Sequence, residues 1–217
     1  MINKIKKINL NHSFIFFLFC NIFSLITFVI NNFTVSPLIC LLLILSIGIS
    51  HGSLDNLKGE KLLKIFGINN FLIFYLLYVL IAIVVIILWI IMPSISLIIF
   101  LIVASYHFGK EDTQFLVIEN SYSNQLLFFI KGTFIVLAPI YFHFDETINI
   151  FKSLLIDNEN FYEFLNFIET NKILLFSVIL STLANIILFI QKFEIKKFAI
   201  FFDYFSILIL NYYFSPL

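Results

Sequence analysis

Charged residues are scarce in this sequence, and arginine is absent. Only 12% of the 217 residues are charged, whereas 61% are hydrophobic. In a soluble domain about a quarter of the residues are charged, so the composition excludes an ordinary soluble globule. The formal net charge is zero and all thirteen basic residues are lysines. Nothing here indicates a basic surface for nucleic acid, and we expect no nucleic-acid partner.

Cysteine is also rare, with Cys20 and Cys40 both inside apolar segments. Their spacing fits neither a disulfide framework nor a zinc motif. We interpret both as small buried hydrophobic residues.

Long apolar runs dominate the rest of the chain, each near the ~20 residues that a helix needs to cross a bilayer. We predict an all-α transmembrane helix bundle of about seven spans, forming one integral membrane domain over residues 1–217. The predicted spans are residues 13–30, 37–54, 70–92, 93–107, 124–142, 172–191 and 198–214. Between the fifth and sixth spans, residues 143–171 predict an external loop with a short amphipathic helix lying on the membrane.

The lysines indicate the orientation of the bundle, because cytoplasmic loops are enriched in basic residues. Under this topology ten lysines share one side, which predicts a cytoplasmic N-terminus. They are residues 4, 6, 7, 58, 61, 64, 110, 192, 196 and 197. Lys131 falls inside a span, where we expect it to snorkel to the interface or to face the bundle interior.

The prolines mark where spans begin. Pro37 and Pro93 each open a span that runs inward, and proline suits the first turn of a helix. Pro216 stands at the equivalent point after the seventh span. This pattern predicts that an eighth, inward-going helix is missing at the C-terminus.

Three other polar residues fall within spans. We predict that Asn21 and Asn185 form hydrogen bonds between helices. Asp203 is predicted to be buried near the inner end of the seventh span, in a structural ion pair with Lys196, Lys197 or a titratable residue in the bundle.

The first motif that could carry chemistry is His51-Gly52-Ser53-Leu54-Asp55, at the inner end of the second span. A helix places residues four apart on one face, so Asp55 can reach His51. A carboxylate orients a metal-bound imidazole and makes it more basic, which gives Asp55 a catalytic role through His51. Gly52 permits a close approach to the backbone.

The second motif, from Ser105 to Thr113, contains His107, Gly109 and Asp112 at the inner end of the fourth span. The second and fourth spans run in the same direction, so His51 and His107 are expected at the same depth. Two imidazoles there are suited to half of an iron site. His143 is predicted on the opposite side, about 30 Å away, and His12 among the lipid headgroups.

Other interpretations of the two histidines stay open. Each could sit among headgroups or interact with a helix dipole. Their spacing does not distinguish iron from zinc, or a metal site from a proton relay.

The two motifs together resemble the Brp/Blh family of membrane β-carotene 15,15′-dioxygenases. Residues 51–55 match its His-Gly-small-Leu-Asp motif, and residues 107–112 match its His-Phe-Gly motif followed by Asp. The segment Ala138–Glu146 is similar to the part of the family that follows the fifth helix. The likeness runs from about Leu41 to the C-terminus.

The resemblance implies oxygen-dependent cleavage of β-carotene into two retinal molecules, in the inner membrane of a bacterium. It implies four histidines around Fe(2+), of which His51 and His107 would be two. The other two belong to a late His-x-x-x-His motif, which this sequence lacks before it ends at Leu217. On that basis we expect an incomplete and inactive fragment unless further ligands are supplied. The implied partners are β-carotene, dioxygen, the lipid bilayer and a rhodopsin that uses the retinal.

Two alternatives belong to other classes. A small transporter or permease would use His51, Asp55, His107 and Asp112 as a proton relay. Another membrane non-haem iron oxygenase, such as a lipid hydroxylase or desaturase, would need more histidines than the four present.

Overall fold

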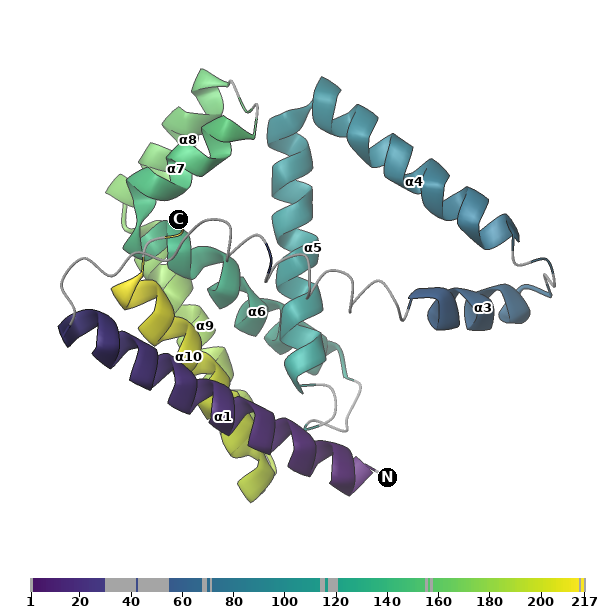
Figure 1. The fold of residues 1–217 in the computed structure, drawn as a ribbon. Coiled ribbons are helices and arrows are strands. Elements are labelled where there is room, and N and C mark those ends of the chain that lie inside the picture. Colours follow the sequence, from purple (N-terminus) through teal and green to yellow (C-terminus); the bar gives the residue numbers. More distant parts are fainter. Residues whose placement is uncertain are drawn as a thin grey trace. The chain divides into compact units, whose positions relative to one another are not determined.

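The computed structural model describes residues 2–29, 42, 55–67, 70, 72–113, 116, 121–154, 156, 158–214 and 216, and no β-strand occurs among them. Their helices are α1 (Ile2–Val29), α3 (Asp55–Ile65), α4 (Leu72–Ile91), α5 (Pro93–Thr113), α6 (Tyr122–Phe142), α7 (Phe144–Ser153), α8 (Glu159–Thr170), α9 (Ile173–Ile190), η1 (Ile195–Lys197) and α10 (Phe198–Tyr213). Figure 1 shows these elements in sequence colours. The predicted all-α class is confirmed.

Five of these helices are long and apolar enough to cross a membrane: α1, α4, α5, α6 and α9. A bilayer core offers no water to backbone groups, so a spanning segment must satisfy its own hydrogen bonds, as a helix does. The chain is an all-α membrane helix bundle. α10 covers the predicted seventh span and has 16 residues. Apart from Leu42, the predicted second span, with Pro37, lies outside the described residues.

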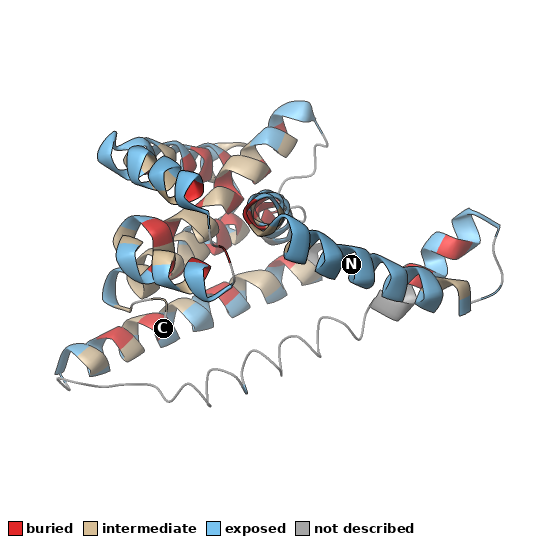
Figure 2. Ribbon diagram, turned by 90° about the horizontal axis from the view of Figure 1, so that it is seen from above, coloured by how far each residue is buried: buried red, intermediate tan, exposed pale blue. Residues whose placement is uncertain are grey.

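The chain forms two compact units, of which the larger comprises residues 1–31 and 97–217. In this unit α1 lies alongside α10, and α6 packs on α9 (Figure 1). Its buried residues gather where these helices meet (Figure 2). One buried cluster joins Phe128 of α6, Leu188 of α9, and Ala199 and Ile200 of α10.

The smaller unit, residues 32–96, contains α3 and α4 among its described residues. These two helices meet closely at Gly59, because a Cβ there would lie 2.2 Å from Cε2 of Phe74. None of the α4 side chains is buried. Membership of all residues in one membrane domain stays a prediction.

Several predicted boundaries shift. α1 begins at Ile2, not near Ser13, because no helix breaker separates the lysines from the apolar run. The connection 143–171 holds two helices, α7 and α8, where one was predicted. α3 begins at Asp55, the last residue of the first motif, and is an additional helix. The predicted start of a helix at Pro93 is confirmed.

The structure also bears on the predictions for polar residues within spans. Lys131 is 4% exposed and faces the interior, which is one of the two expected outcomes. The interhelical prediction for Asn21 and Asn185 was wrong. Their amides donate within their own helices, to the carbonyl oxygens of Phe17 and Ser181 respectively. Asp203 is half-buried on α10.

Candidate functional site

His107 lies in the second half of α5, one turn before Glu111. Its side chain is 53% exposed, and its Nε2 lies 3.5 Å from Oε2 of Glu111. This separation exceeds the length of a good hydrogen bond, about 2.9 Å, so a hydrogen bond between the two side chains would require a side-chain rotation. A carboxylate on one ring nitrogen of an imidazole leaves the other nitrogen available to a cation.

The rotation of α5 is fixed by a close crossing with α6. A Cβ added at Gly109 would lie 1.8 Å from the backbone oxygen of Phe128, and one added at Gly132 would lie 1.8 Å from the backbone oxygen of Ser105. The two backbones therefore touch at these glycines, as small residues allow in membrane helices.

This crossing decides which way His107 projects. Successive residues of a helix are about 100° apart, so His107 lies about 200° around α5 from Ser105, which faces α6. His107 and Glu111 consequently occupy the side of α5 that is turned away from α6. This side is where further ligands of His107 would have to approach.

Two contacts between helices place His107 at one end of the larger unit. The hydroxyl of Tyr106 donates to Oε1 of Gln125 at 2.5 Å, which joins the end of α5 to the start of α6. Nε2 of Gln191 reaches Oδ1 of Asn124 at 3.4 Å, which adds the end of α9. Lys110 of α5 lies 5.4 Å from the ring centre of Tyr106. The His107 end of α5 is thus level with the start of α6 and the end of α9.

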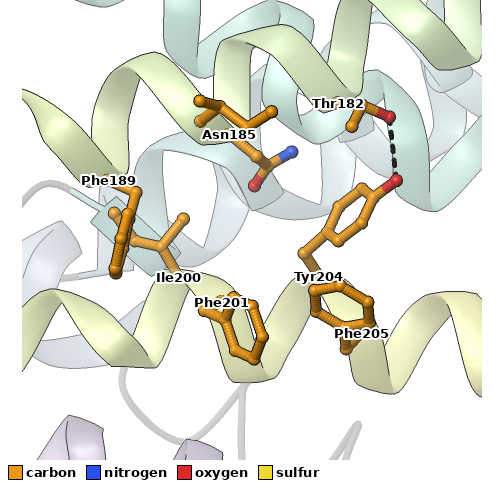
Figure 3. A pocket seen from close by; sticks show the side chains of 8 residues that line it. Thr182, Asn185, Phe189, Ile200, Phe201, Tyr204 and Phe205 are labelled. Atoms are coloured by element: carbon orange, nitrogen blue, oxygen red, sulfur yellow. Dashed lines mark hydrogen bonds between the residues drawn. The ribbon is translucent and has the colours of Figure 1, made fainter.

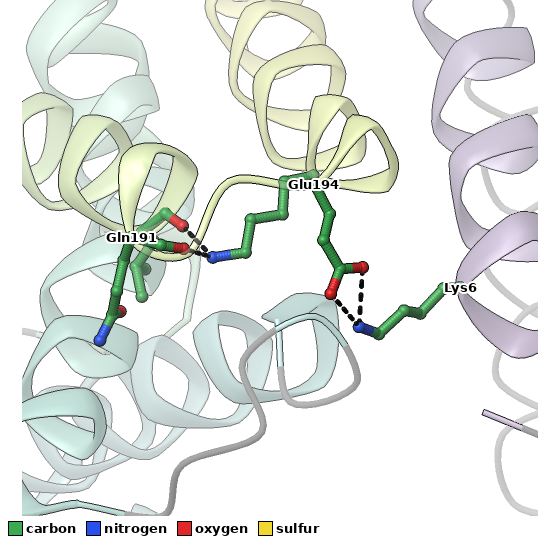
Figure 4. Close-up of polar contacts among 5 residues, drawn as sticks. Lys6, Gln191 and Glu194 are labelled. Carbon is green, nitrogen blue, oxygen red and sulfur yellow. Dashed lines mark hydrogen bonds and ion pairs between the residues drawn. The ribbon is translucent and has the colours of Figure 1, made fainter. Parts of the chain in front are cut away.

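Residues 191–197, which connect α9 to α10, carry an ion pair at this same end (Figure 4). Nζ of Lys6 in α1 donates to both carboxylate oxygens of Glu194, at 3.2 and 3.0 Å. This hydrogen bond with Lys6 lowers the pKa of Glu194. Burial raises the pKa, but its effect is smaller. Nζ of Lys197 donates to the carbonyl oxygens of Leu188 and Gln191, and burial lowers its pKa.

His143 lies at the opposite end of the larger unit. It caps α6, and its Nε2 is 2.7 Å from the backbone oxygen of Asn211 near the end of α10. α6 has 21 residues and at a rise of about 1.5 Å each is roughly 30 Å long, and it separates the His143 end from the end at which α6 starts. The prediction that His143 is too far away to share a metal with His107 is confirmed, and its contact gives it a capping role at α10.

His51 lies outside the described residues. Asp55 is the first residue of α3, but its side chain is not described. The predicted meeting of His51 with His107 therefore stays a prediction, as does the role of Asp55. The side chain of Asp112 is not described either. Among the side chains that are described, no three or more His, Cys, Asp or Glu residues group closely enough to hold a metal ion.

Glu111 is the residue that our sequence reasoning missed. Its signal was present, because Glu111 follows His107 at the same four-residue spacing at which Asp55 follows His51. Asp112 was favoured instead as part of the second motif. It lies five residues beyond His107, which places it about 140° around α5 from that histidine. The i to i+4 rule applies equally to both motifs.

An apolar groove lies on the other side of α5. Its volume is about 270 Å³, and side chains of α5, α6, α8 and α9 line it, including Leu101, Phe129, Leu137, Leu165 and Leu174. Ser105 also lines this groove and His107 does not, so the groove lies on the α6 side of α5. It is a separate feature from the His107 and Glu111 pair.

Comparison with known proteins identifies the family. A family model described as "Beta-carotene 15,15'-dioxygenase" matches residues 42–217, which is most of the chain and includes both histidine motifs. No curated protein and no solved structure matches. The chain belongs to the β-carotene 15,15′-dioxygenase family.

Proposed function

We propose that this protein uses dioxygen to cleave β-carotene at its central 15,15′ double bond. Each oxygen atom of O₂ becomes the carbonyl oxygen of one retinal, so one β-carotene gives two retinal molecules. Membership of the family, over residues 42–217, is the observation that carries this proposal. The exposed His107 with its nearby carboxylate supports it.

The proposed cofactor is Fe(2+), held by His51 and His107. His107 fits this role because its imidazole is half-exposed and Glu111 lies near one ring nitrogen, so that the other nitrogen is open. Imidazole is a usual ligand of iron in proteins. When bound, ferrous iron would supply the activation of dioxygen.

The protein's own residues would orient the ligands. Glu111 would hold Nε2 of His107 and fix the ring tautomer, so that Nδ1 is presented to the metal. Asp55 would do the same for His51, because it stands at the same spacing. Both carboxylates are thus proposed as positioning residues that act through the histidines.

The substrates and the membrane agree in polarity. β-Carotene is an apolar polyene that dissolves in the bilayer core, and this chain exposes long apolar helices to such a core. Retinal released there would pass to a rhodopsin in the same membrane. We place the protein in the inner membrane of a bacterium with its N-terminus in the cytoplasm, following the lysine distribution.

The test uses bacterial cells that accumulate β-carotene and express the protein from its complete gene. Wild-type protein should convert the pigment to retinal and carry iron after purification. His107→Ala and His51→Ala should lose both, while Glu111→Gln should lower iron affinity or activity about 10–100-fold. His12→Ala is the matched control, because His12 is exposed on α1 and lies outside both motifs.

The result distinguishes the proposal from its rivals. If wild-type protein binds iron but leaves β-carotene intact, another iron-dependent reaction replaces this one. If the histidine variants retain full iron and activity, the proposed ligands are wrong.

A further inference from the structure

A small pocket lies between α9 and α10, and His107 is not among the residues that line it. Its volume is about 250 Å³. Thr182, Asn185 and Phe189 line it from α9, and Ile200, Phe201 and Tyr204 line it from α10 (Figure 3). The walls are therefore mostly aromatic and aliphatic, with one amide and two hydroxyl groups.

Asn185 is the unusual polar residue of this pocket. Its side chain is only 6% exposed, and no described residue donates a hydrogen bond to its Oδ1. The amide oxygen points toward α10 across the pocket (Figure 3). A buried acceptor without a partner has lost its hydrogen bonds to water and regained none, so an occupant of the pocket that donates to it would be favoured.

The orientation of this amide is fixed by its other end. Nδ2 of Asn185 donates to the carbonyl oxygen of Ser181 at 2.9 Å. A flipped amide would set Oδ1 against that carbonyl oxygen, and two acceptors repel each other. Oδ1 therefore remains the atom that faces the pocket.

The two hydroxyl groups do not supply the missing donor. Thr182 donates its proton to the carbonyl oxygen of Val178 at 2.8 Å. Its oxygen then accepts from the hydroxyl of Tyr204, which lies 2.8 Å away (Figure 3). Both protons are thus committed, and the pocket presents an acceptor among mostly apolar side chains.

We propose that this pocket binds a compact apolar alcohol from the membrane, whose hydroxyl donates a hydrogen bond to Oδ1 of Asn185. The alicyclic or branched body of the ligand would fill the space between Phe189, Phe201 and Ile200. A ketone of the same shape would bind poorly, because it would bring a second acceptor to Oδ1. This site does not depend on the proposed cleavage of β-carotene.

The size of the pocket limits the ligand. Pockets for drug-sized ligands usually measure about 300–1,000 Å³, and this one is slightly smaller. It suits a single ring with short substituents and not an entire long-chain lipid. Fixed polar groups in such a pocket set the orientation and specificity of the ligand.

Menthol and menthone provide a matched test, since they share a carbon skeleton and differ in having a hydroxyl or a ketone. Binding of radiolabelled menthol to the purified protein in lipid nanodiscs should be saturable above empty nanodiscs. Unlabelled menthol should compete about tenfold better than menthone, the ratio that a buried hydrogen bond supports. Non-saturable uptake, or equal competition by the two compounds, would overturn the proposal.

Two variants separate the hydrogen bond from general effects on folding. Asn185→Leu keeps the size of the side chain and should abolish the preference for menthol over menthone. Asn21→Leu is the matched control, because Asn21 makes the same kind of bond within α1 and does not line the pocket; it should leave the preference intact. If Asn185→Leu retains the preference, or if Asn21→Leu removes it, Asn185 is not the acceptor.

Discussion

Buried charge in the larger unit is held by specific partners. The side chain of Lys6 is 3% exposed and that of Glu194 is 47% exposed. An isolated buried ammonium group is strongly disfavoured, so Lys6 depends on Glu194 for its position. This pair ties the first turns of α1 to residues 191–197, the connection that precedes α10.

The ion pair makes stability depend on pH in a defined direction. Lys6 lowers the pKa of Glu194 in the folded protein. A lowered carboxylate pKa contributes stability above its unfolded value, about 4.3, and this contribution is lost as the pH falls through the folded value. We expect Glu194→Gln to have a lower Tm than wild type at pH 7, and the difference to shrink as the pH falls below about 4.

Glu60→Gln is the matched control for this experiment. Glu60 also accepts from a lysine, Lys64, at 2.7 Å, but both side chains are largely exposed and belong to one helix. Exposed pairs of this kind contribute little, so Tm should hardly change at either pH. Equal losses in the two variants at pH 7 would show that burial of Lys6 adds nothing to the ion pair.

Single residues differ in how far the sequence predicts them. The position of His107 near the end of its span follows from hydropathy, and His143 at the opposite end follows from the same pattern. The bonds of Asn21 and Asn185 did not follow, because an asparagine in a helix can reach its own carbonyl four residues back as well as a neighbour. Only the packing of the helices decides between these partners.

The α5–α6 pair shows why the second motif contains a glycine. Gly109 and Gly132 bring the two backbones into contact, and this contact sets the face on which His107 lies. We expect Gly132→Ala to destabilise the protein by about 3 kcal/mol or more, since the neighbour is rigid backbone and the helices must separate. Reversible unfolding in detergent micelles would measure this loss.

Gly67→Ala is the comparison variant. Gly67 has φ of +70° and no atom within 4 Å of an added Cβ, so only backbone strain of about 1–2 kcal/mol is expected. A loss at Gly132 no larger than the loss at Gly67 would contradict the close crossing of α5 and α6.

At the scale of helices, hydropathy predicts the long spans well because each must satisfy its backbone within an apolar solvent. It predicts α4 at residues 72–91 within a few residues. It misses the start of α1, since charged turns add no hydropathy but are still helical. It also misses the break between α7 and α8, where Asn158 caps α8 by accepting from the backbone nitrogen of Phe161.

The larger unit as a whole has two chemically different ends. His107, Lys6 and residues 191–197 share one end through the contacts among α1, α5, α6 and α9. The other end carries His143 and the acidic first turns of α7 and α8, with Asp145, Glu146 and Glu159. Basic residues favour the cytoplasmic side of a membrane, so the His107 end should face the cytoplasm, from which iron would then be loaded.

This orientation is testable with single cysteines introduced after Cys20 and Cys40 are replaced by alanine. Lys192→Cys and Glu159→Cys place exposed thiols at opposite ends of the larger unit. In intact cells a membrane-impermeant maleimide should modify Glu159→Cys, and should modify Lys192→Cys only after the inner membrane is opened. The reverse pattern would place His107 on the outer side, and modification of both thiols from one side would contradict the arrangement of α6, α9 and α10. Because the ion pair between Lys6 and Glu194 keeps the N-terminal turns beside residues 191–197, Lys4→Cys should show the same pattern of modification as Lys192→Cys.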